Sequence, residues 1–259
     1  MVIWTSPVKI VLGLAFLGLA SFQDYSTREI DDRIWLAFGT LGGAVSIYEV
    51  VSLSDYATTL IFLVSVFVSF LIGLALYYGG LTGGADAKAI WALGLTFPYY
   101  PSNPLFSPIL PVYPLMVLSI LDNAMLLTLA LVFHNVIRNS IHLTRTRDAF
   151  PSGLPGWKKI VLIATAIRVR TSKVDWSKAF PVEVIDFSSD PPEKRISLFT
   201  SVKEDVDADG IARGHELGLI GDDIWISQGI PLVIFFAAGF LLSLILGDLL
   251  LALLSSVLV

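Results

Sequence analysis

The segment YATTLIFLVSVFVSFLIGLALYY, residues 56–78, decides the fold class of this chain. It carries no charge and exceeds the roughly 20 residues that a helix needs to cross a hydrocarbon core of about 30 Å. Around it, 55% of the 259 residues are apolar and only 15% are charged, where about 25% is usual for a soluble domain. Mean hydropathy is +0.76. We therefore expect a membrane protein, which excludes a soluble enzyme, a disordered chain and a basic nucleic-acid binder.

Further apolar segments flank this one and predict a polytopic α-helical membrane protein with about six transmembrane helices. The fourth segment is short and ends at a proline, so its length is less than that of the others. The six predicted spans are residues 7–22, 34–51, 56–78, 87–98, 112–137 and 229–259.

The stretch between the fifth and sixth predicted helices has a soluble composition and holds most of the charged residues. Alternating apolar and polar residues predict short strands at 181–187 and 195–202. Residues 160–167 fit either a core strand or a membrane-surface helix. We expect three parts, which are membrane helices in 1–137, a small β-containing cytoplasmic insert in 138–228, and a last membrane helix in 229–259.

The insert also carries a pattern that matches the spacing of a calcium-binding loop. The sequence shows no convincing helices on its two sides, so an acidic surface turn is the favoured interpretation over ion binding. The residues that make the pattern are Asp205, Asp207, Asp209, Gly210 and Glu216.

Basic residues indicate the orientation in the membrane. All 17 Lys and Arg residues except Lys9 lie in residues 27–33, 87–88 and 138–228. With six spans these stretches share one side, which the positive-inside rule makes cytoplasmic. We therefore expect a multi-pass protein of the cell membrane with both termini outside.

Two aspartates lie at that cytoplasmic boundary. Asp24 follows the first predicted helix, and Asp86 lies between the third and the fourth. Two carboxyls at hydrogen-bonding distance share one proton, so the ionised member can take a proton from water while the other donates to a scissile carbonyl. Because a helix N-terminus favours an anion, we expect Asp86 to be the ionised member and Asp24, at a helix C-terminus, the protonated one.

The loop GGLTGGAD, residues 79–86, leads into the second aspartate. Its glycines permit backbone turns that other residues disfavour and let a substrate backbone approach. A flexible interhelical loop is the plainer interpretation of the glycines alone, and the aspartate among them weighs against it.

These two motifs resemble those of the archaeal prepilin and preflagellin (archaellin) peptidases, which are GxGD-type membrane aspartyl proteases. In that family the first aspartate lies in a D-x-x-x-R-x-[IV] pattern, matched here by Asp24, Arg28 and Ile30. The second aspartate closes a Gly-x-hydrophobic-Asp motif, matched by Gly83, Gly84, Ala85 and Asp86.

The resemblance implies that Asp24 and Asp86 are catalytic and that Gly83, Gly84 and Ala85 form the backbone beside them. It implies removal of class III signal peptides from type IV pilin-like or archaellin precursors at the cytoplasmic boundary. The partners are then these precursors and the lipid bilayer, with no nucleic acid. No metal and no organic cofactor is expected, and the sequence does not fix the oligomeric state.

Three acidic residues follow the first aspartate closely, namely Glu29, Asp31 and Asp32. The family's precursors carry Lys or Arg just before the cleavage site, so this acidic trio fits a tentative substrate-binding role through charge attraction. A merely solvated acidic loop is the alternative, and the sequence favours it.

A cation-coupled transporter or channel is the strongest rival from another functional class. The same two aspartates would then relay cations, although a relay usually needs carboxylates near the middle of the membrane. An inert membrane scaffold leaves the paired aspartates unexplained. His134, His142 and His215 have no ligand spacing, which weighs against a metalloprotease.

Overall fold

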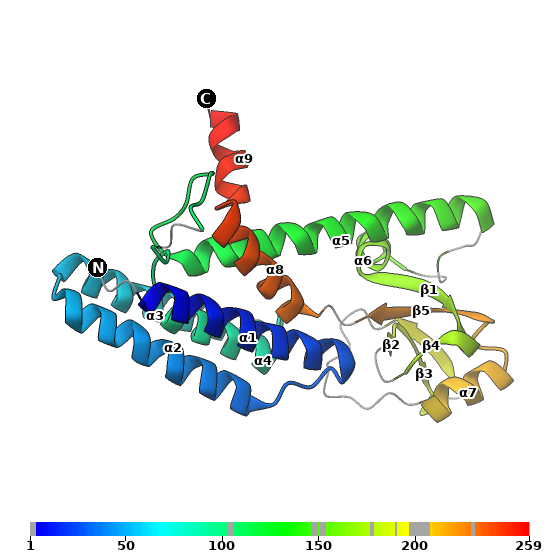
Figure 1. The fold of residues 1–259 in the computed structure, drawn as a ribbon. Coiled ribbons are helices and arrows are strands. Elements are labelled where there is room, and N and C mark those ends of the chain that lie inside the picture. Colours follow the sequence, from blue (N-terminus) through cyan, green and yellow to red (C-terminus); the bar gives the residue numbers. More distant parts are fainter. Residues whose placement is uncertain are drawn as a thin grey trace. The chain divides into compact units, whose positions relative to one another are not determined.

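The computed structural model describes residues 4–102, 106–146, 150, 154–176, 179–189, 191–196, 208–228 and 231–258. Contacts divide the chain into two compact units (Figure 1). One unit comprises Met1–Thr128 with Pro231–Val259, and the other comprises Leu129–Ile230.

The first unit is entirely helical in its described elements and holds both candidate aspartates. Asp31 and Asp55 start two of the helices, because each side chain accepts a hydrogen bond from a backbone N–H of the first turn. The helices are α1 (Thr5–Ser26), α2 (Asp32–Leu53), α3 (Tyr56–Tyr78), α4 (Gly84–Thr96), the first part of α5 (Met116–Thr146), α8 (Leu232–Ile245) and α9 (Leu249–Leu258).

Four helices in the described part of the chain, α1, α2, α3 and α5, are long and apolar enough to cross a membrane. The bent pair of α8 and α9 makes a fifth span if the two count together. The multi-pass helical prediction is thus confirmed, but the count of six is not. The helix α4 has only 13 residues and rises about 20 Å, which is too short for the hydrocarbon core.

The last predicted span is not one helix, because α8 and α9 meet at an angle of 63°. Gly247 adopts φ +106°, a conformation that L side chains rarely adopt. Asp248 then caps α9 by accepting a hydrogen bond of 2.8 Å from the Leu251 N–H. A glycine followed by a capping aspartate is the signature of one helix ending and another beginning, and the sequence prediction overlooked it.

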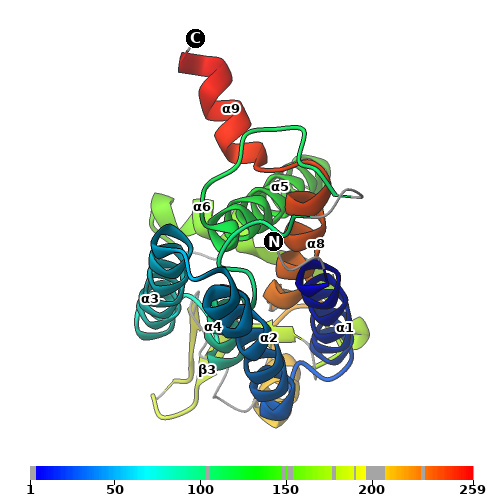
Figure 2. The ribbon, with the colours of Figure 1, turned by 60° about the vertical axis from the view of Figure 1, so that its left-hand side comes forward.

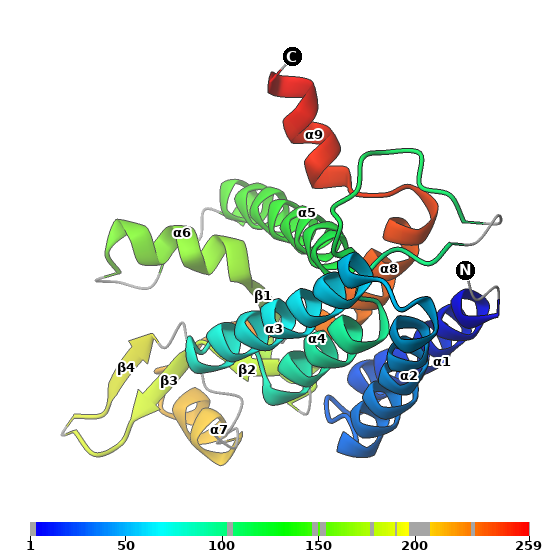
Figure 3. The ribbon, with the colours of Figure 1, turned by 90° about the vertical axis from the view of Figure 1, so that its left-hand side faces the viewer.

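The short α4 packs between α2 and α3 (Figure 2), and Figure 3 shows the same neighbours from another side. Glycines allow this close approach. A Cβ atom on Gly42 of α2 would lie 1.9 Å from the Thr96 hydroxyl of α4. One on Gly94 of α4 would lie 2.0 Å from the Ser69 hydroxyl of α3. Small residues at such contacts are typical of helices that associate within lipid.

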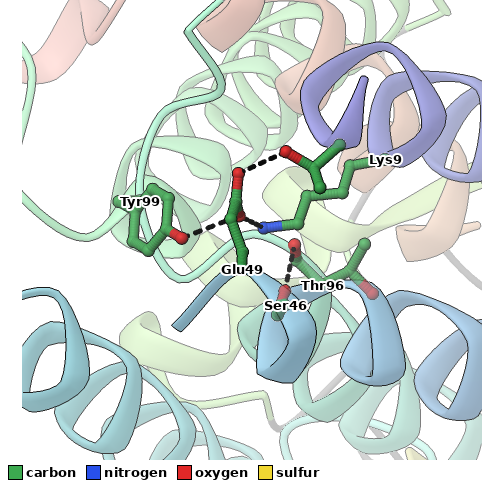
Figure 4. A network of polar contacts seen from close by, with 6 residues as sticks. Lys9, Ser46, Glu49, Thr96 and Tyr99 are labelled. Carbon is green, nitrogen blue, oxygen red and sulfur yellow. Dashed lines mark hydrogen bonds and ion pairs between the residues drawn. The ribbon is translucent and has the colours of Figure 1, made fainter. Parts of the chain in front are cut away.

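A buried polar network joins the start of α1 to the end of α2 (Figure 4). Glu49 forms an ion pair with Lys9 and accepts hydrogen bonds from the Thr5 hydroxyl at 2.6 Å and the Tyr99 hydroxyl at 2.7 Å. Tyr99 lies just after α4, so the network also holds the chain that leaves this helix. Lys9 is the basic residue that lies outside the three basic stretches of the sequence, and Glu49 neutralises its charge.

The second unit contains two small antiparallel sheets and short helices, in line with a β-containing insert. One sheet has the strand order β1–β5–β2, and the other pairs β3 with β4. Besides the end of α5, its elements are α6 (Gly156–Thr165), β1 (Ala166–Arg170), the 3-10 turn η1 (Thr171–Lys173), β2 (Ala179–Pro181), β3 (Glu183–Asp186), β4 (Glu193–Ile196), α7 (Ala208–Glu216) and β5 (Asp223–Gln228).

The strand predictions in the insert are met in part. Residues 181–187 hold the end of β2 and all of β3, and β4 ends at Ile196. Residues 197–202 lie outside the described residues, as do Asp205 and Asp207 of the calcium-loop pattern. The rest of that pattern belongs to the helix α7, whereas a calcium loop needs a sharp turn at its glycine.

Residues 160–167, which fitted either a strand or a surface helix, contain parts of both. The helix α6 runs to Thr165 and β1 begins at Ala166. Trp157 and Ile160 of α6 are exposed while Leu162 is fully buried, so this helix is amphipathic.

The contact between α8 and α5 yields a stability prediction. A Cβ atom on Gly239 of α8 would lie 2.4 Å from the Ile120 backbone oxygen and 3.0 Å from the Ala124 nitrogen. Backbone atoms cannot move aside as a side chain can, so Gly239→Ala should cost about 1–3 kcal/mol of stability. A thermal melt in detergent measures this cost.

Gly18→Ala is the matched control, because a Cβ atom there meets nothing within 4 Å. This substitution in α1 should leave the melting temperature unchanged or raise it slightly. Equal melting temperatures for the two variants would contradict the close packing of α8 on α5.

Candidate active site

Asp24 lies in the last turn of α1, which ends at Ser26. A compact turn follows and leads directly into α2. Within it, the Asp31 N–H donates to the Gln23 side-chain oxygen at 3.0 Å, and the Thr27 hydroxyl donates to the Gln23 backbone oxygen at 3.1 Å. Arg28 adopts φ +60°, which is uncommon outside glycine. The turn is therefore held by side chains of the residues around Asp24.

Asp86 lies in the first turn of α4 and caps that helix. Its Oδ2 accepts a hydrogen bond of 2.9 Å from the Gly83 N–H. The carboxylate is thus fixed at a helix N-terminus, where the helix dipole favours an anion.

The glycine loop before Asp86 has fewer conformational constraints than its composition suggests. Gly80 adopts φ +67°, a conformation that favours glycine. Gly83, by contrast, has φ −77°, and a Cβ atom on it would make an ordinary contact of 3.5 Å with Asp86 Oδ2. A Cβ atom on Gly84 would have similar room. The expectation that these glycines serve strained turns is therefore wrong for Gly83 and Gly84.

A third element, the start of α8, reaches Asp24. The Val233 backbone N–H is directed at the Asp24 carboxylate, and the Ser21 hydroxyl of α1 donates to the Val233 oxygen at 3.4 Å. A helix N-terminus thus faces Asp24 as well as Asp86. The assignment of the proton to Asp24 therefore stays a prediction, because the dipole of α8 also acts on this carboxyl.

The two aspartates lie close enough for their charges to act on one another. They come from residues 62 positions apart and are brought to one end of the helical unit by α1 and α4. The ion pair between Lys88 of α4 and Asp32 of α2, at 2.6 Å, links the same ends of these helices. Two carboxyls so placed influence one another's titration.

Unpartnered polar atoms gather at the end of α1, in the turn that follows it and in the glycine loop before α4. Asp24 Oδ2, Arg28 Nε and Nη1, and the Thr82 hydroxyl are buried without a hydrogen-bond partner in the described part of the chain. Buried polar atoms in native proteins are normally satisfied. This concentration of free groups beside two carboxyls suits a site that holds water or a substrate backbone.

The acidic trio lies beside the site, but its members differ. Asp31 accepts a hydrogen bond from the Arg33 N–H and caps α2, and Asp32 is bound to Lys88. Glu29 is exposed and forms no ion pair with a described residue. The charge free to attract a ligand is therefore that of Glu29.

Sequence reasoning missed the contributions of Val233 and Thr82. Pro231, directly before α8, was an available signal, because proline is favoured where helices begin. It places a helix N-terminus on the side of the membrane where Asp24 was expected. No comparable pattern marks Thr82.

Comparison with known proteins identifies the family of this chain. Residues 11–136 match the model of the type IV leader peptidase family, and residues 158–249 match the archaeal peptidase A24 C-terminus, type II. Between them these matches include both aspartates and the start of α8. The chain belongs to the type IV leader peptidase family.

Relatives of this peptidase family match over nearly their whole length. The chain is 24% identical to the preflagellin peptidase of Methanococcus maripaludis, over 93% of this chain and 96% of the relative. It is 26% identical to that of Methanocaldococcus jannaschii, over 93% and 94%. It is 23% identical to that of Methanococcus voltae, over 93% and 96%.

Two substitutions in the glycine loop distinguish the cost of backbone strain from the cost of crowding by an added Cβ atom. Gly80→Ala should lower stability by about 1–2 kcal/mol, because alanine resists φ +67°. Gly83→Ala should melt like the wild type. Thermal melts in detergent distinguish the two substitutions, and an equal loss in both would contradict the conformation of this loop.

Proposed function

We propose that this chain removes class III signal peptides from preflagellin-like or pilin-like precursors, with Asp24 and Asp86 as its catalytic dyad. The proposal rests on the position of these two carboxyls, which act on one another at one end of the helical unit. Membership of a family of leader peptidases and preflagellin peptidases as relatives support the substrate class.

The proposed mechanism uses water as the nucleophile. One carboxylate takes a proton from water as the oxygen attacks the scissile carbonyl, while the other carboxyl donates its proton to the carbonyl oxygen. The structure does not favour either aspartate for either role, because a helix N-terminus faces each one. Catalysis in this mechanism depends on the single proton that the pair shares, whichever aspartate carries it.

The positions of the helix ends support a site near one membrane boundary. Asp24 lies two residues before the end of α1, and Asp86 lies in the first turn of α4. Arg28, Arg33 and Lys88 occur at this end of the unit, and Lys9 at the far end of α1 is neutralised by Glu49. By the positive-inside rule, we infer that the dyad faces the cytoplasm.

A transporter that uses the same aspartates is the second candidate. Their location at helix ends, rather than halfway along a span, disfavours a relay across the bilayer. The family match favours the peptidase.

Isosteric substitution of each aspartate tests the dyad. Asp24→Asn and Asp86→Asn should each lower kcat by at least about 100-fold, because each removes a group that must exchange a proton. The measurement is cleavage of a purified class III precursor in liposomes. Asp55→Asn is the matched control, since Asp55 is also a helix-capping aspartate but lies at the opposite end of α3 from the glycine loop.

Cleavage that survives either substitution in a folded protein would remove that aspartate from the mechanism. The rate should also fall at acidic pH, where both carboxyls become protonated. A rate without an acidic limb would contradict a shared-proton dyad. Ion flux that depends on both residues, without cleavage by the wild type, would favour the transporter.

Gly83, Gly84 and Ala85 are proposed to border the path of the substrate backbone. Neither backbone conformation nor local space demands glycine at 83 or 84, so room for a substrate is the remaining reason for glycine there. Gly83→Ala should then fold normally and still cleave more slowly in the same assay.

Of the acidic trio of Glu29, Asp31 and Asp32, we propose that Glu29 attracts the basic residue that precedes the cleavage site, because the other two are engaged in a helix cap and an ion pair. Glu29→Lys should raise KM about threefold for a precursor with Lys at that position, because it reverses an exposed charge. A precursor with a neutral residue there is the control and should show no change. The difference should shrink at high salt, and an unchanged KM for both precursors would refute the idea.

A further inference from the structure

The break between α8 and α9 contains a second buried polar cluster, at the other end of α8 from Asp24. Its centre is Asp248, whose side chain is fully buried. The cluster includes Asn123 and Ser119 of α5 and Ser243 of α8, and Tyr100 from the segment after α4. The proposed proteolysis uses none of these groups.

The backbone at this break is well satisfied by hydrogen bonds. The Leu246 oxygen accepts from the Ile109 N–H at 3.0 Å and from the Leu110 N–H at 2.8 Å. The Asn123 side chain donates to the Gly247 oxygen at 2.8 Å and accepts from the Leu249 N–H at 3.0 Å. The structure therefore fixes this irregular backbone without using the Oδ2 atom of Asp248.

Asp248 has one satisfied and one free carboxylate oxygen. Oδ1 accepts a hydrogen bond of 2.8 Å from the Leu251 N–H at the start of α9. Oδ2 is buried and has no hydrogen-bond partner among the described residues. A buried anion with a free oxygen is costly unless a cation or a proton compensates it.

Two other buried oxygens, on the neighbouring residues Tyr100 and Ser119, also lack a hydrogen-bond partner among the described residues. The Tyr100 hydroxyl lies within electrostatic range of Asp248 and faces the hydroxyls of Ser119 and Ser243 without reaching hydrogen-bonding geometry. The Ser119 hydroxyl, on a fully buried residue, also lacks a partner in the described part of the chain. Ser243 is engaged, because it donates to Gly239 and accepts from Asn123.

The charges around this cluster are negative. Asp122 of α5 lies close enough to Asp248 for their charges to interact. Neither aspartate forms an ion pair with a described residue, and the nearby network of Tyr99 uses Lys9 to neutralise Glu49.

We propose that Asp248 Oδ2, the Tyr100 hydroxyl and the Ser119 hydroxyl bind a sodium ion at the break between α8 and α9. Carboxylate and hydroxyl oxygens are ligands for hard cations. A single fully buried carboxylate matches the charge of a monovalent ion, and close packing favours a small one. Irregular backbone between half-helices is where membrane proteins place such ions.

Sodium dependence of stability tests this site. The purified protein in detergent should melt about 5 °C higher in saturating NaCl than in choline chloride of equal ionic strength. The effect should saturate with concentration, and KCl should act more weakly. Bound ²²Na⁺, measured directly by scintillation proximity, should follow the same titration.

Substitutions locate the ion. Asp248→Asn keeps a capping residue and should abolish both the shift and ²²Na⁺ binding. Tyr100→Phe leaves the cap intact and should raise the half-saturating NaCl concentration about tenfold. Asp55→Asn, which alters an exposed capping aspartate at another helix, should respond to sodium like the wild type.

Equal melting temperatures in NaCl and choline chloride would overturn the proposal and leave a proton as the compensating charge. An equal response to all alkali cations, or full sodium binding by Asp248→Asn, would overturn it as well. The proposal is independent of the peptidase function, since cleavage of a precursor does not enter either readout.

Discussion

The arrangement of this protein depends on one constraint, which is that α4 is too short to cross the bilayer. Every backbone polar group within lipid must find a partner inside the protein. A 13-residue helix meets this condition only if neighbouring helices surround it and a non-helical segment follows it within the protein. The glycine contacts of Gly42 and Gly94 allow α2 and α3 to enclose α4, and Tyr99 holds the departing chain against Glu49.

This packing also determines the chemistry of the site. The first turn of α4 carries Asp86, and the ion pair of Lys88 with Asp32 joins that turn to the start of α2. Because a tight turn connects α1 to α2, Asp24 is brought to the same end of the unit. The N-terminus of α8 then supplies the Val233 N–H to Asp24. Three helix ends thus converge on two carboxyls: the Gly83 N–H is hydrogen-bonded to Asp86, and both the Arg28 side chain and the Val233 N–H act on Asp24.

The sequence predicted the membrane class, the long helices and the two aspartates at one boundary, because hydrophobic length and charge placement are local properties. It predicted a full span for residues 229–259, although Gly247 and Asp248 mark the break between α8 and α9. Its assignment of Asp24 to a helix C-terminus and Asp86 to a helix N-terminus is confirmed, whereas the approach of Val233 to Asp24 depends on tertiary packing and has no local signal. Asp31 caps α2 and Asp32 pairs with Lys88. The sequence alone does not distinguish these two roles, because both residues occur in one acidic stretch.

The proximity of Asp24 and Asp86 is the most direct point to measure. The chain contains no cysteine, so cysteines introduced at these two positions are the only thiols present. A reagent that fluoresces only when it bridges two neighbouring thiols should label the pair Asp24→Cys with Asp86→Cys. The pair Asp24→Cys with Asp55→Cys, whose members lie at opposite ends of the unit, should remain dark. Equal fluorescence from both pairs, or none from the first in a folded protein, would contradict a shared site for the two aspartates.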